Sequence, residues 1–336
     1  MNRLTPRSLL DTAVRFRLVI VLVAVAILGA LLLSDFFAVS TLRSVLDRAT
    51  IVGLLALGLT PVLIAGQIDL SVGSTLSMAG ITTIGLQPVL GNVPALLCGL
   101  AVGALIGAFN AVVVVVFKIS SLVATLASLL IFASLALLLT NSYPLSSQDA
   151  TFGLGLTARV AEIFTPRSLI FLTMALLMLV WLRWTPMGRN LYAVGGNPAA
   201  AASAGIKPNR YLALVFVFSG FLSGAAGVLQ SLSNAAGSPV AGSTMLIPAI
   251  TAVVIGGTRL EGGRGSALAT LGGVIALGAL TTLLEFSGVP AYTQAIYTGL
   301  LLILLIALDR LAGSDRRTAF RTHRVVRDES ATPTTH

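Results

Sequence analysis

The chain has 336 residues, of which 56% are hydrophobic and only 10% are charged, and its formal net charge is +9 at pH 7. A soluble domain carries about 25% charged residues and cannot bury this much apolar surface in one core, so the composition excludes an ordinary soluble protein. Apolar runs of about 20 residues recur along most of the chain, which is typical of membrane-spanning helices. Continuous runs such as residues 169–182 also argue against a β-barrel, whose strands alternate in hydrophobicity.

The inventory of reactive side chains is small. The single cysteine, Cys98, lies in an apolar run and has no partner for an internal disulfide, and both histidines, His323 and His336, lie near the C-terminus. No metal-ligand cluster and no catalytic set can be assembled from these residues, so we expect no catalytic site, metal or cofactor in this chain. The basic residues lie at the ends of apolar runs and in the tails, which favours topology determinants and contacts with anionic lipid over binding of nucleic acid.

Ten helices are expected along the chain. The first apolar run follows four arginines and could be a signal peptide, but no small-x-small cleavage site follows it, which favours an uncleaved helix. The segment 244–257 is short for a complete span and is a candidate half-helix or re-entrant piece. The expected helices lie near 18–38, 50–66, 71–90, 93–117, 121–141, 167–183, 210–233, 244–257, 265–286 and 292–309.

The distribution of lysine and arginine orients these helices. With both termini in the cytoplasm, 17 of the 21 basic residues fall in cytoplasmic segments, as the positive-inside rule requires. The predicted fold is therefore an all-α polytopic membrane protein with a cytoplasmic N-tail (1–17), a transmembrane domain (18–309) and a basic, disordered cytoplasmic C-tail (310–336). A five-plus-five split would give an inverted repeat, in which Ser71–Leu76 corresponds to Pro239–Met245.

The long polar connection 142–166 falls on the external side. It is either a docking surface for an external partner or a plain connector. The stretch from Ala158 to Phe164 is a candidate surface helix.

Three polar segments interrupt the apolar pattern, and the first lies at 66–74. Polar groups facing lipid are costly, so this segment must face protein or water. The carboxylate of Asp69 could cap a helix that begins near Ser71, because it would pair with free N–H groups at the positive end of the helix. One interpretation is a pore-lining or gating break, and the alternative is a structural cap in a short cytoplasmic turn. The candidate gating residues are Gln67, Asp69, Ser71, Gly73 and Ser74.

The second segment is the cytoplasmic connection between Trp184 and Arg210. Gly195-Gly196 marks a turn, Asn197 is a good N-cap, and Pro198 suits the first helical position. The alanine run that follows predicts a helix of about two turns, either fitted into a partner's groove or lying at the membrane surface. The candidate residues for coupling to an ATPase are Gly188, Arg189, Gly195, Gly196, Asn197, Ala201, Gly205 and Ile206.

The third segment is a glycine-rich loop that follows the short helix at 244–257. It resembles a phosphate-binding loop in composition, but no Lys-Ser/Thr pair follows the glycines, and no Walker-type segment occurs elsewhere. We therefore expect ATP to be bound by a separate chain if transport is ATP-driven. A tight intracellular turn anchored by arginines is the alternative. The residues of interest are Gly256, Gly257, Arg259, Gly262, Gly263 and Arg264.

These three segments resemble the permease subunits of bacterial ATP-binding-cassette (ABC) importers for ribose, xylose, arabinose, rhamnose and the autoinducer-2 type of signal. The family's first motif typically reads Gly-Gly-Ile-Asp-Leu-Ser-Val-Gly-Ser, and here Gln67 replaces the second glycine. Its cytoplasmic motif is Gly-Arg-x-x-Tyr-Ala-x-Gly-Gly-Asn followed by an acidic residue, and here Pro198 and Ala199 stand at the acidic position. The third motif matches at every fixed position from Ala252 to Ser266.

The resemblance implies a multi-pass inner-membrane subunit that is not itself an enzyme. Its expected partners are an ABC ATPase subunit seated on 188–206, an external or periplasmic solute-binding protein, and a second, identical or different, permease chain. The expected substrate is a neutral monosaccharide of unknown identity, moved by alternating access. An ion-coupled secondary transporter and an ABC permease for a nucleoside are the alternatives. The candidate polar residues of the pore are Asn110, Ser128, Gln230 and Asn234.

Overall fold

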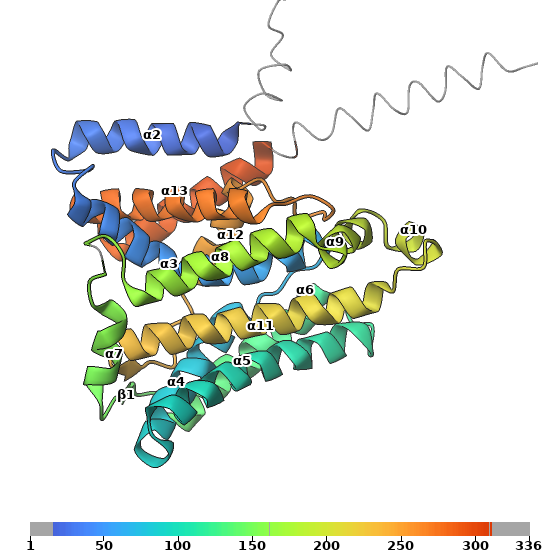
Figure 1. Ribbon diagram of the computed structural model, residues 1–336, viewed down its shortest axis with the longest axis horizontal. Helices are drawn as coiled ribbons and strands as arrows, with labels where there is room; N and C mark the ends of the chain where they lie inside the picture. The colour runs from blue at the N-terminus through green and yellow to red at the C-terminus, as the bar shows by residue number, and fades with distance from the viewer. Residues whose placement is uncertain (1–15, 161, 309, 311–336) are drawn as a thin grey trace, which may run out of the picture.

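The computed structural model describes residues 16–160, 162–308 and 310, which fold into a bundle of long helices (Figure 1). The strands β1 (Leu145–Ser146) and β2 (Ala236–Gly237) pair in antiparallel fashion. The described helices are α2 (Arg17–Leu32), α3 (Val39–Ile64), α4 (Val72–Leu90), α5 (Asn92–Val115), α6 (Ser121–Leu139), α7 (Ala150–Thr157), α8 (Pro166–Trp184), α9 (Pro186–Gly196), α10 (Pro198–Ser203), α11 (Pro208–Ser233), α12 (Leu246–Ile255), α13 (Ala267–Phe286) and a last helix over Ala291–Leu308.

Each of the ten expected segments contains a helix, but the count of ten membrane spans is not confirmed. Seven of the described helices are long and apolar enough to cross a membrane. α2 has 16 residues and α12 has 10, which is short for a hydrocarbon core of about 30 Å. α4 has 19 residues but carries many glycine, serine and threonine residues, and most of it is buried among other helices. The chain is thus a mostly helical, polytopic membrane protein.

The largest error in the expected boundaries concerns α3. It begins at Val39 rather than near residue 50, because the charged residues Asp47 and Arg48 lie within the helix instead of before it. Arg167 lies 3.3 Å from Asp47, and Arg48 forms an ion pair with Glu285. These pairs tie α3 to α8 and α13 and offset the cost of charges near the apolar region.

Glycine contacts set the centre of the bundle, where α11 packs against α5. Gly103 and Gly107 are one helical turn apart on α5, and Gly220 and Gly224 are one turn apart on α11. A Cβ atom built on Gly103 would lie 2.6 Å from the Gly220 carbonyl oxygen and 2.6 Å from the Gly224 Cα. Small residues spaced by four therefore bring the two backbones into direct contact, as is common between membrane helices.

The short helix α12 agrees in length with a half-helix near 244–257, which stays a prediction. Its ten residues rise about 15 Å, which is half of a bilayer core. Residues 251–255 are buried, and α12 packs so closely on α13 that Gly273 could carry no side chain beside the Ala252 carbonyl.

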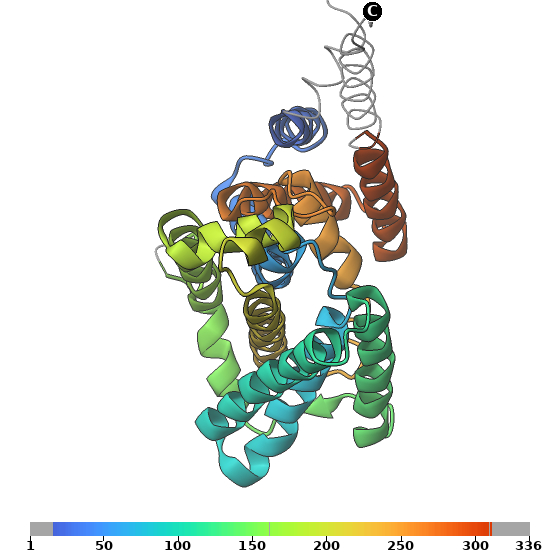
Figure 2. The ribbon, with the colours of Figure 1, turned by 90° about the vertical axis from the view of Figure 1, so that its right-hand side faces the viewer.

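The ends of the helices gather on two opposite faces of the bundle (Figure 1). One face carries α9, α10 and the loop 256–266, and we call it the elbow face. The opposite face carries α7 and the β1–β2 pair. Figure 2 shows α2 and the last helix on one side of the bundle and α4, α5 and α6 on the other.

The expected surface helix between Ala158 and Phe164 is wrong. The helix of this connection is α7, and Val160 and Phe164 instead form an isolated antiparallel bridge. The reason is the Asp149 carboxylate, which accepts the N–H groups of Thr151 and Phe152 and so caps a helix that begins at residue 150.

Parts of the predicted organisation are not tested. The tails lie almost wholly outside the described residues, and the cytoplasmic location of both termini stays a prediction. The inverted repeat also stays a prediction, although its two matched segments lie against each other. The Gly242 N–H donates to the Ser77 hydroxyl at 3.0 Å, and a Cβ on Gly73 would lie 2.5 Å from the Gly242 carbonyl oxygen.

Candidate functional site

The polar break between α3 and α4 is an irregular segment, residues 65–71, inside the bundle. Because the segment is neither helix nor strand, some of its backbone N–H groups have no backbone partner, and side-chain hydroxyls of α6 accept their hydrogen bonds. The Ile68 N–H donates to the Ser121 hydroxyl at 3.2 Å, and the Leu70 N–H donates to the Thr125 hydroxyl at 3.0 Å. Irregular backbone at membrane depth is tolerated only where protein or water satisfies it in this way.

Asp69 lies at the centre of this break and is only 1% exposed. One carboxylate oxygen accepts the Ser71 N–H at 3.0 Å and the Ser71 hydroxyl at 2.6 Å. The other accepts the hydroxyl of Ser219, on α11, at 2.7 Å. The capping prediction is thus correct only in part, because Asp69 holds the residue before α4 and makes no bond to the N–H groups of its first turn.

The hydrogen bonds continue from Ser71 to two further helices. The Asn110 amide on α5 donates to the Ser71 hydroxyl at 2.8 Å, and the Ser128 hydroxyl on α6 donates to the Asn110 carbonyl oxygen. We call Asp69, Ser71, Asn110, Ser128 and Ser219 the buried polar cluster; each is 0–1% exposed.

The cluster contains only some of the residues expected from the sequence. Asn110 and Ser128 belong to it, whereas Gln230 and Asn234 lie at the far end of α11. Gln67 is half-buried, and the Ser74 hydroxyl donates to the Ser71 carbonyl at 2.9 Å. Ser219 was missed. Its only signal is its place in a stripe of small residues on an apolar helix, which marks a face in contact with protein.

The connection between α8 and α11 forms two helices rather than the one expected. Thr185 caps α9, and Gly195 and Gly196 end that helix instead of forming a separate turn. Asn197 then caps α10 as expected, its side chain accepting the Ala200 N–H at 3.0 Å. Gly205 follows at φ +82°, the left-handed conformation that ends helices. We call residues 186–206 the elbow.

Most of α10 is exposed, and Ala201 is its buried residue. At the start of the elbow, Gly188 packs on the carbonyl groups that end α8, where a Cβ would lie 2.5 Å from the Leu182 oxygen. Ile206 is half-buried, and its N–H donates to the Ala201 carbonyl at 3.0 Å, which folds the end of the elbow back on α10.

The three sequence motifs meet at one place, which the sequence did not predict. The Gly263 N–H, in the glycine-rich loop, donates to the Ile64 carbonyl at the end of α3, at 2.8 Å. A Cβ on Gly262 would lie 2.7 Å from the Gly195 carbonyl oxygen and 2.8 Å from the Gly66 Cα. The break, the elbow and the loop therefore touch through their backbones. We call Gly66, Gly195, Gly262 and Gly263 the glycine junction.

The remaining residues of the glycine-rich loop shape it. Gly256 lies tightly against the backbone of α13, and Gly257 has φ +91°. The Arg259 N–H donates to the Arg264 carbonyl at 3.2 Å, which closes the loop. Within the described residues, neither arginine side chain forms an ion pair.

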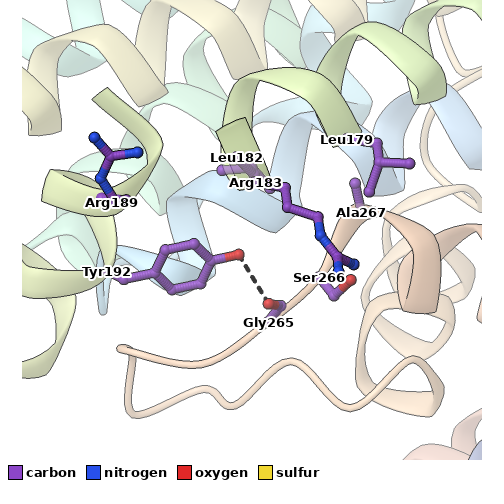
Figure 3. Close-up of a pocket in the computed structure, with 8 residues that line it drawn as sticks. All are labelled: Leu179, Leu182, Arg183, Arg189, Tyr192, Gly265, Ser266 and Ala267. Carbon is purple, nitrogen blue, oxygen red and sulfur yellow. Dashed lines mark hydrogen bonds between the residues drawn. The ribbon is translucent and has the colours of Figure 1, made fainter. Parts of the chain in front are cut away.

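A cavity of about 370 Å³ lies beside the glycine junction, between the end of α8, α9 and the start of α13 (Figure 3). The Tyr192 hydroxyl donates across it to the Gly265 carbonyl at 2.9 Å, so the elbow is also bonded to the chain that enters α13. Burial raises the pKa of the Tyr192 phenol, which therefore remains a neutral donor. Arg183 and Arg189 line the cavity and form no ion pair within the described part of the chain.

A bundle of spanning helices with a broken helix pair, a buried polar cluster and an elbow on one face is the architecture of a membrane permease. Residues 41–306 match the family described as the permease component of branched-chain amino acid transport systems. The chain belongs to this family.

Several named proteins are similar to this chain over most of its length. It is 35% identical over 290 residues to the ribose import permease protein RbsC of Bacillus subtilis, a match that covers 84% of this chain and 89% of the relative. It is 32% identical to RbsC of Escherichia coli K12, covering 87% and 92%. It is 34% identical to the autoinducer 2 import system permease protein LsrD of Escherichia coli SMS-3-5, covering 76% and 79%. No solved structure matches the chain.

Proposed function

We propose that this chain is the inner-membrane permease subunit of an importer for a neutral sugar, driven by ATP hydrolysis in a separate subunit. The observation that carries the proposal is the similarity over most of the chain to permeases named for ribose import. The family description names branched-chain amino acids instead. The buried polar cluster favours a sugar, because it offers hydroxyl, amide and carboxylate groups and no cation for the carboxylate of an amino acid.

The first prediction concerns the energy source and the substrate. In proteoliposomes that contain the chain, its ATPase subunit and its solute-binding protein, we expect labelled ribose to accumulate only when ATP is present. Labelled leucine and adenosine serve as controls for the amino acid and nucleoside alternatives and should not accumulate. Accumulation of ribose by the chain alone under an ion gradient would instead establish a secondary transporter.

We also propose that the elbow is the docking site of the ATPase. It projects from the bundle, and most of α10 is exposed small side chains that allow close approach of a partner (Figure 1). The acidic residue usual in this motif is absent, so no salt bridge to the ATPase is expected at that position. Within the described residues Arg183 and Arg189, at the neighbouring cavity, form no ion pair, so they can offer cations to acidic groups of the partner.

The second prediction tests this docking. Ala202 is exposed on α10, and Ala202→Arg should uncouple transport from ATP hydrolysis, because a long cation would hold the two surfaces apart. We expect transport to fall roughly tenfold, since displacing a packed interface side chain costs on the order of 1–2 kcal/mol. Uptake and ATPase activity should be measured together.

The control is Ala291→Arg, an exposed alanine at the start of the last helix, outside the elbow. It should leave coupling unchanged. Coupled transport at the normal rate in Ala202→Arg would remove the elbow from the docking surface.

The opposite face is proposed to receive the solute-binding protein. Described residues of the connection 142–166 are held to the bundle, because β1 pairs with β2 and Asp149 accepts the Asn92 amide at 2.6 Å. Hydrogen bonds from Thr151 and Asn92 lower the pKa of Asp149, so this cap stays ionised at neutral pH. A fixed external surface supports the docking interpretation over a plain connector. A second permease chain, identical or different, would complete the translocation path.

A further inference from the structure

We infer that the buried polar cluster is a binding station for the hydroxyl groups of a polyol substrate during its passage. The inference rests on the proposed function and adds the residues that would contact the sugar. In the described conformation the cluster is closed, because its five side chains satisfy one another.

The first argument is the cost of the cluster. Asp69 is buried deep in an apolar bundle, where an ionisable group is expensive and usually functional. Well-packed apolar side chains would hold the same helices together at least as well. The cluster joins the break, α5, α6 and α11, so it lies where the moving parts of a permease would separate.

The second argument is that groups of a sugar can replace the internal hydrogen-bond partners of the cluster. Ser219 and Ser71 donate hydroxyl hydrogens to the two oxygens of Asp69, at 2.7 and 2.6 Å. A sugar hydroxyl donates the same kind of hydrogen bond, and a sugar oxygen can accept from the Asn110 amide in place of Ser71. Each hydrogen bond lost within the cluster is replaced by a hydrogen bond of the same type to the sugar. The net free energy of binding is therefore small, as a transport path requires, because tight binding would stop release of the substrate.

The third argument is the orientation of the donors. The Ser71 hydroxyl donates its one hydrogen to Asp69, so it can only accept from Asn110, whose amide must direct its N–H groups toward Ser71. The Asn110 carbonyl oxygen then faces the Ser128 hydroxyl, which can donate to it or to the Ala124 carbonyl at 3.0 Å. Ser71 is thus a positioning residue for Asn110. A second-layer bond that fixes a donor is typical of a binding site, where orientation matters.

The fourth argument is the route to opening. The break that carries Asp69 is joined to the elbow at the glycine junction, through the bond from Gly263 to Ile64 and the contact between Gly195 and the end of α3. A shift of the elbow on ATP binding would move the break and part Asp69 from Ser219. The freed carboxylate would then accept hydroxyl groups of the substrate.

The experiment compares two serines of α11 that are both fully buried. Ser219 donates to Asp69, whereas Ser223, one turn later, donates only to the carbonyl of its own helix at 2.8 Å. Binding of labelled ribose to the purified permease–ATPase complex, without the solute-binding protein, is measured for Ser219→Ala, Ser223→Ala and Asp69→Asn. Size-exclusion profile and basal ATPase activity report folding.

We expect Ser219→Ala to bind ribose about threefold to tenfold more tightly, because Asp69 loses the internal donor that competes with the substrate. Asp69→Asn should bind about tenfold more weakly, and Ser223→Ala should match the unchanged complex. A merely structural bond would leave Ser219→Ala equal to Ser223→Ala or weaken its binding.

Equal binding by the two serine variants would overturn the inference, as would undetectable ribose binding in a complex that still transports ribose. If Asp69→Asn does not fold, the comparison of the serines decides alone. Failure of the unchanged complex to transport ribose would instead count against the proposed function.

Discussion

A single added methyl group at position 195 is expected to abolish coupled transport. In Gly195→Ala the new Cβ would lie well within 3.0 Å of the Ile64 carbonyl oxygen, a separation that real Cβ atoms essentially never show, and 2.9 Å from the Gly263 nitrogen. The atoms it meets are backbone, so no side chain can turn away. The elbow must therefore separate from the break and the loop. Overpacking of this kind costs about 1–3 kcal/mol.

The neighbouring glycine provides a matched control. A Cβ on Gly196 would meet nothing within 4 Å, so Gly196→Ala should transport normally. Uptake and ATPase activity of reconstituted complexes give the readout, and expression level and thermal stability separate a loss of coupling from a loss of folding. Full transport by Gly195→Ala would show that close contact at the glycine junction is not needed.

Replacement of the buried carboxylate is expected to have the second-largest effect, with Asp69→Asn lowering transport roughly tenfold or more. Asparagine keeps the shape but cannot accept bonds on both sides as the carboxylate does, and each hydrogen bond to a charged group is worth about 1.5–3 kcal/mol. Transport should fall more than expression does, because the cluster would remain packed. Rate of uptake per inserted complex is the measurement.

Glu285→Gln is the control for this substitution, because the Glu285 carboxylate also joins two helices, through its ion pair with Arg48, but is exposed. It should weaken this ion pair and leave uptake nearly intact. If Asp69→Asn instead prevented accumulation of folded protein while Glu285→Gln did not, a purely structural role for Asp69 would be supported.

The positions of the helices were predictable because their signals are local. An apolar run of sufficient length forms a helix in lipid wherever it occurs, and Asn197, Pro198 and Gly205 set the limits of α10 through their own backbone preferences. The predicted start of a helix was wrong where residues distant in the sequence pair with its charged side chains. α3 begins at Val39 because Arg167 and Glu285, from other helices, neutralise its charges.

The candidate site was predictable only in part. Asp69 and Ser71 stand out because polar residues are rare in an apolar chain, whereas Ser219 does not, since one serine in a helix can bond to its own backbone at little cost. No sequence pattern links residue 219 to residue 69. Their contact depends on how α11 crosses the break, which in turn depends on the glycine packing between α5 and α11.

The sequence by itself determined the class of protein, the lipid environment and the three motifs, because hydrophobicity, charge and turn chemistry act within a few residues of one another. Only the tertiary structure decided that the three motifs meet at the glycine junction and that Asp69 is held by α11. These contacts join residues far apart in the chain, so they depend on the rotation and crossing of whole helices, which hydrophobic runs do not specify.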